Sequence, residues 1–152
     1  MVEIVANMHM HTPYSDGEQY HREIAEAAAR AGVDVIIATD HNVLVPGVDG
    51  MVAGVLVLAG EEVHDKLRVP QANHCLVYNA CDEMVSYAPD PQTLVDEVRK
   101  RGGLAFLAHP VEYGSPINHG LAPISWADWN LRHLTGIELW NYMSEFKSHL
   151  WS

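Results

Sequence analysis

Histidines and carboxylates stand at the ends of the short apolar stretches of this chain. His9 and His11 follow the apolar run that begins at Val2, and His41 follows the run that begins at Val33. Later apolar runs end in residues of the same kinds, namely Glu61, Glu62 and His109. Imidazole and carboxylate groups are ligands for zinc, manganese and iron in proteins. A divalent metal held in this way lowers the pKa of a bound water toward about 7 and so supplies hydroxide for hydrolysis.

Strands and helices that alternate along the chain would bring these residues together. The apolar pattern predicts strands over residues 2–8, 33–38, 55–59, 74–78, 104–108 and 136–139. It predicts helices over residues 18–31 and between Asp90-Pro91 and Gly102, and a long loop over 112–130 with a short helix over 126–131. Such alternation favours parallel strands with right-handed crossovers. Residues at the carboxyl ends of parallel strands then meet on one face, as in α/β barrels.

Length and composition predict one soluble domain that spans residues 1–152. The net charge of −11 argues against electrostatic capture of duplex nucleic acid or of an anionic membrane. No apolar stretch approaches the roughly 20 residues that cross a bilayer, and the N-terminal residues lack a basic segment before an apolar core. Two cysteines do not imply a disulfide framework, so we expect a cytoplasmic protein.

Five short motifs, taken in order, resemble those of the PHP family, the polymerase and histidinol phosphatase domain. The first is His-Met-His-Thr-Pro-Tyr-Ser-Asp-Gly at residues 9–17, and the second is Thr-Asp-His-Asn at residues 39–42. The others are Gly60-Glu61-Glu62, Asn73-His74 and Ala108-His109-Pro110. Each motif alone is weak evidence, but together they cover most of the chain in the order that this family shows.

The resemblance implies a distorted (β/α)7, TIM-like barrel with two or three divalent metal ions, zinc, manganese or iron. By this similarity, His9 and His11 bind a first metal, and Glu62 bridges it to a second. The remaining implied ligands are His74 and His109 for the second metal, and Asp16 and His41 for a third. Asp40 would shape the turn or orient a ligand rather than bind metal directly. The implied reaction is the attack of metal-bound hydroxide on the phosphate ester of a small metabolite or nucleotide.

One motif of the family is missing from this sequence. Family members carry a late Asp-x-His motif whose Asp joins the first metal and whose His joins the third, and no Asp-x-His follows His109. The barrel is therefore expected to be incomplete at its C-terminal side, with an open edge where another chain could pair. The chain could be a fragment, could be completed by a partner, or could carry a degraded site.

Several assignments stay open at the level of sequence. Asp16 could cap a helix, His74 could be a core histidine, and periodicity does not decide between Glu61 and Glu62. Candidate phosphate contacts are Lys66, Arg68 and Arg132. Besides the phosphoesterase, two other functions fit the residues. One is a non-catalytic metal-binding domain completed by another chain segment, and the other is a metal-dependent amide or lactone hydrolase on a related barrel.

Overall fold

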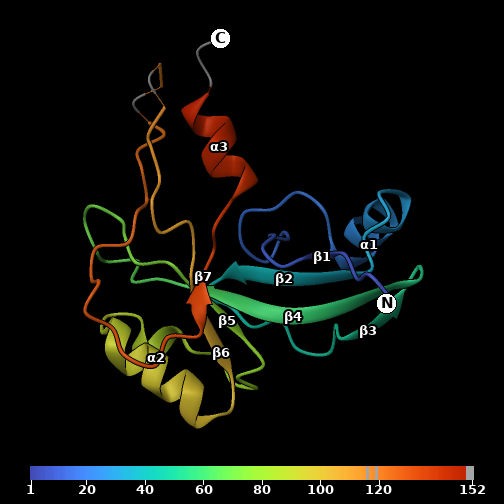
Figure 1. Ribbon diagram of the computed structural model, residues 1–152, viewed down its shortest axis with the longest axis horizontal. Coiled ribbons are helices and arrows are strands. Elements are labelled where there is room, and N and C mark those ends of the chain that lie inside the picture. Colours follow the sequence, from blue (N-terminus) through green and yellow to red (C-terminus); the bar gives the residue numbers. More distant parts are fainter. Residues whose placement is uncertain (116, 119, 150–152) are drawn as a thin grey trace.

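A single mixed sheet organises the protein in the computed structural model, which describes residues 1–115, 117, 118 and 120–149. The strands run in the order β1 (Ala6–Asn7), β2 (Val35–His41), β4 (Val55–Val63), β5 (Cys75–Tyr78), β6 (Leu104–Leu107) and β7 (Gly136–Ile137). A further strand, β3 (Gly50–Val52), pairs with the first half of β4. The sheet curves into half a barrel (Figure 1).

The expected (β/α)7 barrel is wrong. β4 pairs antiparallel with β5, and β5 pairs antiparallel with β6, whereas β1–β2, β2–β4 and β6–β7 are parallel. The described residues form three α-helices: α1 (His21–Arg30), α2 (Pro91–Lys100) and α3 (Tyr142–Ser148). The segment between β4 and β5 contains no helix, and a parallel return requires a crossover of a dozen or more residues that is usually helical. β5 therefore runs back beside β4.

The structure differs from the predicted elements in three further places. Ala53 and Gly54, both with positive φ (52° and 84°), form the two-residue turn of a β3–β4 hairpin, and β3 is a strand that was not predicted. Residues 126–131 form no helix, which corrects the short helix predicted there. A short 3₁₀ helix, η1 (Val85–Tyr87), precedes α2, and α3 follows β7 with Asn141 as its N-cap.

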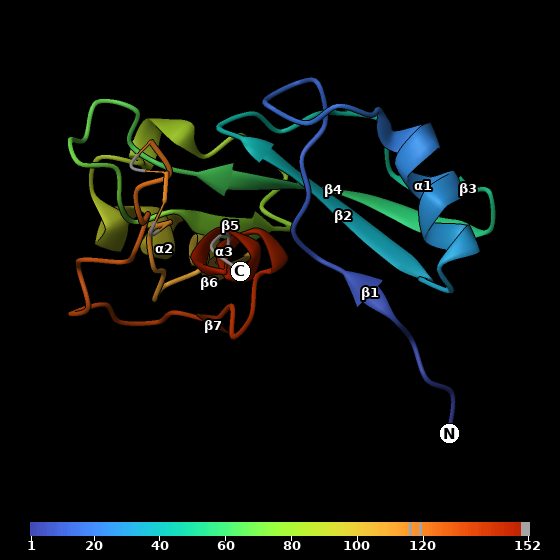
Figure 2. The same ribbon diagram turned by 90° about the horizontal axis from the view of Figure 1, so that it is seen from above.

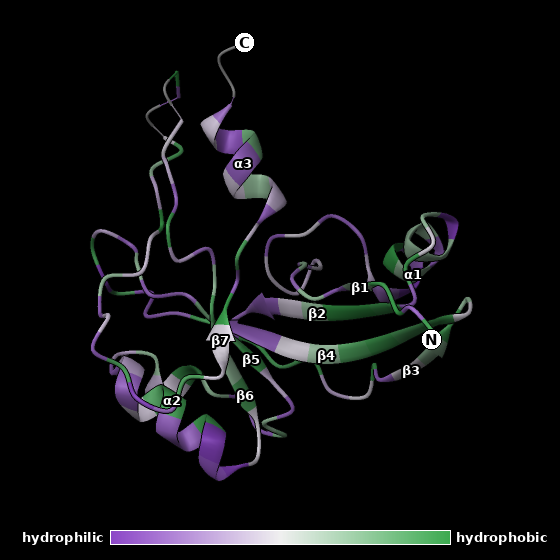
Figure 3. Ribbon diagram, viewed as in Figure 1, coloured by the Kyte–Doolittle hydropathy of each residue, from purple (hydrophilic) through white to green (hydrophobic). Residues whose placement is uncertain are grey.

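Two helices cover different strands on one face of the sheet. α1 packs against β2 and β4 around Ala25, Ile36 and Val57, and α2 packs beneath β5 and β6 around Leu94 and Val98 (Figures 1 and 2). β2 and β4 are hydrophobic over most of their length and become hydrophilic where they approach β7 (Figure 3). The apolar part of each long strand thus forms core, and its polar end belongs to a site.

The outer edges of the sheet are short. β1 pairs only with β2, and β7 pairs only with β6, among the strands that the structure describes. The expected pairing of an open edge with another chain stays a prediction. Within the same described residues, no helix has the length and apolar character needed to cross a membrane.

The packing of α2 against the sheet gives a prediction about stability. Leu94 is 1% exposed in the core, whereas Leu104 at the start of β6 is 45% exposed. We expect Leu94→Ala to lower the free energy of unfolding by about 2–5 kcal/mol, because it leaves a cavity in the core. The matched change Leu104→Ala should cost less than about 1 kcal/mol. Urea unfolding of both variants measures the difference, and equal losses would contradict this description of the core.

Candidate metal centre

Glu62 lies at the centre of a cluster of five histidines. It is the penultimate residue of β4 and is 1% exposed. Its Oε2 lies 3.0 Å from His9 Nε2, 3.1 Å from His11 Nε2 and 3.2 Å from His41 Nδ1. Its Oε1 lies 2.8 Å from His74 Nδ1 and 3.1 Å from His109 Nε2. One carboxylate thus has three imidazoles around one oxygen and two around the other.

The sheet explains how residues far apart in the sequence reach Glu62. His41 and Glu62 are direct partners in the parallel register of β2 and β4. His109 follows β6, whose carboxyl end lies at the same edge. His74 precedes β5, and because β5 is antiparallel to β4 and β6, its first residues lie beside the carboxyl ends of those strands. The antiparallel strand therefore contributes its histidine from its amino end.

The hydrogen bonds of the outer ring nitrogens fix how two of these imidazoles face Glu62. His9 Nδ1 lies 2.9 Å from Glu138 Oε1, and His109 Nδ1 lies 2.9 Å from the carbonyl oxygen of Ile124. Both partners are acceptors, so each Nδ1 carries a proton. When the ring is neutral, its Nε2 then carries a lone pair. Each lone pair then faces a carboxylate oxygen about 3 Å away. A proton or a cation between them removes this repulsion.

The pKa values of His9 and Glu62 indicate a proton between the two side chains. Burial disfavours protonated His9, but hydrogen bonds to Glu138 and Glu62 outweigh it and raise the pKa of His9 to about 10. Burial alone would raise the pKa of Glu62, but hydrogen bonds from the surrounding imidazoles, led by His109, hold it well below the usual value. Glu62 is therefore ionised at neutral pH. Without metal, a proton on His9 neutralises part of its charge.

Polar atoms without partners point to further ligands. Nδ1 of His11, Nδ1 of His41 and Nε2 of His74 are buried and make no hydrogen bond among the described residues, although His41 Nδ1 lies 3.2 Å from Glu62 Oε2. Four groups place their ligand atoms within 4.8 Å of one another: His9, His11 and Glu62; Glu62, His74 and His109; His11, Asp16 and His41; and His41, His64 and His74. Unpartnered nitrogens beside a buried carboxylate are the donor set that zinc, manganese or iron accepts. The residues present fit divalent metal ions.

Asp16 reaches the cluster through a tight loop. Gly17 N donates to the carbonyl of Thr12, and a Cβ at position 17 would lie 2.1 Å from the carbonyl oxygen of His11, so only glycine fits there. Asp16 Oδ1 lies 3.7 Å from His11 Nδ1, and Asp16 Oδ2 lies 3.6 Å from His41 Nε2. Since α1 begins at His21 with Tyr20 as its N-cap, Asp16 is not a helix cap.

Asp40 supports that loop through its side-chain hydrogen bonds. It is 1% exposed, and it accepts hydrogen bonds of 2.7 Å from the backbone N and the hydroxyl of Thr12 and from the hydroxyl of Ser15. These bonds hold the segment between His11 and Asp16. The placement is consistent with the predicted role of Asp40 in shaping the turn.

Glu61 and His64 lie next to predicted ligands but have different contacts. Glu61 points to the opposite face of the sheet, where it accepts a hydrogen bond from Met84 N at 2.8 Å, and burial raises its pKa to about 7. The ring of His64 stacks on His74 with centroids 4.2 Å apart. Burial and the nearby imidazoles lower the pKa of His64 to about 4.

The three basic residues predicted to contact phosphate are not among the cluster contacts. Arg68 pairs with Asp128 at 3.0 Å, and the backbone of Arg132 bonds to the side chain of Gln92. Lys66 is exposed in the loop after β4. Their role in phosphate binding stays a prediction.

Glu138 is the residue that the sequence reasoning missed. It follows β7; its Oε1 accepts from His9 Nδ1 and from Asn141 Nδ2, and its Oε2 accepts from the backbone N of His109 at 2.7 Å. Glu138 therefore holds the ring of His9 and the backbone of His109. Its signal was present, because it too is a carboxylate at the end of an apolar strand.

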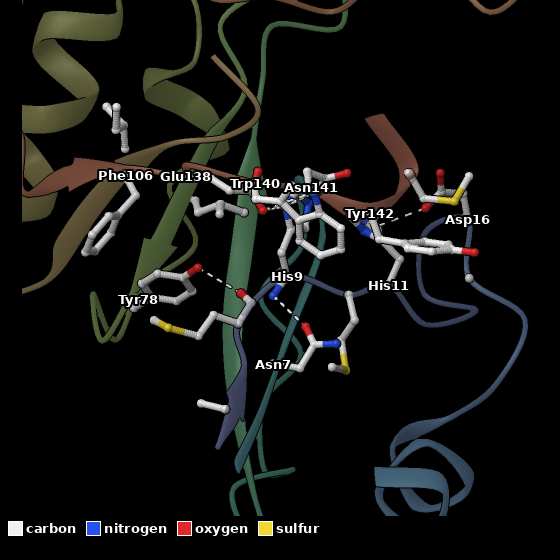
Figure 4. Close-up of a pocket in the computed structure, with 17 residues that line it drawn as sticks. Asn7, His9, His11, Asp16, Tyr78, Phe106, Glu138, Trp140, Asn141 and Tyr142 are labelled. Carbon is white, nitrogen blue, oxygen red and sulfur yellow. Dashed lines mark hydrogen bonds and ion pairs between the residues drawn. The ribbon is translucent and has the colours of Figure 1, made fainter. Parts of the chain in front are cut away.

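A cavity of about 920 Å³ adjoins the cluster. His9, His11, Asp16 and Glu138 line one part of it, and β1, β5, β6, β7 and the start of α3 form its walls (Figure 4). The cluster thus borders a space of the size of small-molecule sites, which are about 300–1,000 Å³.

Comparisons with known proteins find similarity to a curated protein and to solved structures. No protein-family model matches the chain. It is 26% identical over 120 residues to the uncharacterized protein MJ1587 of Methanocaldococcus jannaschii, a match that covers 69% of this chain and 67% of that protein. A solved two-domain protein from Bacteroides vulgatus, containing a predicted PHP-like metal-dependent phosphoesterase, matches with a TM-score of 0.50 and 24% identity. That match covers 70% of this chain and only 35% of the other, and it shows a similar fold.

The contacts of Glu138 predict an effect on metal affinity. Glu138→Gln replaces the carboxylate that orients His9 with an amide, and loss of such an outer partner typically weakens metal binding by about 10–100-fold. Titration of Mn²⁺ or Zn²⁺ against a competing chelator measures the change. The matched control is Glu26→Gln on the exposed face of α1, which should bind metal like the wild type. Equal affinities in all three proteins would refute the orienting role.

The raised pKa of His9 predicts how stability depends on pH in metal-free protein. Because its pKa rises from 6.5 to about 10 on folding, its contribution is full below about pH 6.5 and is lost as the pH rises toward 10. We expect the free energy of unfolding of chelator-treated protein to fall between pH 7 and 10. His9→Gln should flatten this fall. Parallel pH profiles for the two proteins would be incompatible with a charged His9–Glu62 contact.

Proposed function

We propose that this chain is a PHP-type, metal-dependent phosphoesterase that hydrolyses a phosphate ester of a small molecule. The observation that carries the proposal is the position of ionised Glu62 between two sets of imidazoles. The likeness in fold to the Bacteroides vulgatus protein supports the same reading. Membership of the PHP family and the substrate class are parts of the proposal.

The residues of the cluster divide among two or three divalent ions. His9, His11 and Glu62 would hold one ion, and Glu62, His74 and His109 would hold a second. Asp16 and His41, together with His11, would hold a third. When bound, such ions supply positive charge for the phosphate oxygens and a bound water whose pKa is lowered toward about 7. Zinc, manganese and iron all accept this set of ligands.

The protein groups around these ligands have separable tasks. Glu138 and the Ile124 carbonyl keep the Nδ1 protons on His9 and His109, so that both Nε2 lone pairs face inward. Asp40 holds the loop that carries Asp16. The nearly complete burial of Glu62 excludes bulk water from its carboxylate and strengthens every charge interaction there.

Metal loading and phosphate release test the proposal together. Purified protein incubated with Mn²⁺ or Zn²⁺ should retain metal after gel filtration and release inorganic phosphate from phosphate monoesters. His9→Ala should lower the bound metal and reduce phosphate release by at least about 100-fold, since it removes a ligand. His133→Ala, whose side chain pairs with Asp96 at the surface, is the control and should retain both.

Two other outcomes would change the conclusion. Tight metal binding without hydrolysis of any phosphate ester would favour the non-catalytic metal-binding alternative. Absence of bound metal in wild-type protein would sink both readings.

A further inference from the structure

The cavity beside the metal cluster has two chemically different parts. His9, His11, Asp16 and Glu138 line the part next to Glu62. The rest is largely apolar, and six of its residues are Met8, Tyr78, Phe106, Trp140, Tyr142 and Met143. In Figure 4, Tyr78 and Phe106 lie to one side of His9, and Tyr142 lies on the other side, near His11. A ligand held at the cluster would therefore extend between aromatic rings.

Charge restricts what could occupy the apolar part. No lysine or arginine lines the cavity in the part of the chain that the structure describes. A substrate with several phosphates, or a nucleic-acid backbone, would carry charges that only the metal ions could balance. One phosphate at the cluster joined to an uncharged group fits both parts of the cavity.

The rim of the cavity carries exposed aromatic side chains. Trp140 and Tyr142 are each 64% exposed, and their ring centroids lie 6.3 Å apart in a T-shaped arrangement. A large apolar surface exposed beside a polar site is typical of ligand-binding grooves. The volume of about 920 Å³ exceeds what a phosphate alone needs and leaves room for an organic group.

Building on the proposed phosphoesterase function, we propose that the substrate is the monophosphate ester of an uncharged aromatic alcohol. The phosphate lies at the metal cluster, and the aromatic group lies against Tyr78, Phe106 and Trp140. Hydrolysis adds one water across the ester bond: the water oxygen joins phosphorus, and the bond between phosphorus and the ester oxygen breaks. The ester oxygen takes a proton, and the products are the free alcohol and inorganic phosphate.

Binding of two phosphonates tests this substrate class without turnover. Calorimetric titration of Mn²⁺-loaded protein compares 2-phenylethylphosphonate with methylphosphonate, which share the anionic group and differ in the aromatic ring. We expect the aromatic ligand to bind at least about tenfold more tightly, because its ring is buried in the cavity. Trp140→Ala should reduce this ratio to about threefold or less and leave the methylphosphonate Kd unchanged.

A matched control and a turnover assay complete the experiment. Trp129→Ala removes a tryptophan that is 56% exposed and does not line this cavity, so the ratio should stay as in the wild type. Phosphate release should likewise be faster from 2-phenylethyl phosphate than from glycerol 3-phosphate, both esters of primary alcohols. Equal binding of the two phosphonates would overturn the aromatic substrate and leave the phosphoesterase intact. Failure to bind either phosphonate or phosphate would instead count against the phosphoesterase itself.

Discussion

The structure depends on the neutralisation of one buried carboxylate. Glu62 is almost fully buried, and an isolated charge in such a position costs several kcal/mol unless it is paired. Five imidazoles surround it, but His9 and His109 in their neutral forms direct lone pairs rather than protons at it. Protonation of His9 neutralises the charge of Glu62 in part, and divalent cations on both sides of Glu62 would neutralise it fully. The same groups that are costly together in metal-free protein thus form a favourable ligand set for metal.

The mixed sheet is what makes this arrangement possible. Parallel β2, β4 and β6 bring His41, Glu62 and His109 to one edge, and antiparallel β5 adds His74 from its opposite end. Since the sheet closes only halfway, part of its inner face, including Leu76, is not covered by another strand and lines the cavity. The open half of the barrel therefore provides both the approach to the cluster and an apolar surface next to it.

The sequence predicted the components of the cluster better than the sheet that holds them. The motifs named seven candidate ligands, and all of them except Asp16 lie where an apolar run ends or begins. The structure places their ligand atoms in neighbouring groups, and their role as metal ligands stays a prediction. Strand direction could not be read in the same way. The pattern of apolar residues is the same for a parallel and an antiparallel strand, and only the lack of a helix between residues 64 and 74 distinguishes them. Glu138 was not predicted, because the family motif expected late in the chain is Asp-x-His, although Glu138, like Glu62, is a carboxylate at the end of an apolar strand.

Diffraction from crystals grown with Mn²⁺ or Zn²⁺, recorded at the absorption edge of the metal, is the most direct measurement of the central claim. The account predicts anomalous peaks on both sides of the Glu62 carboxylate, one beside His9 and His11 and one beside His109, at about 2.0–2.3 Å from the ligand atoms. Crystals grown with the metal that show no anomalous peak within coordination distance of Glu62 would contradict the account.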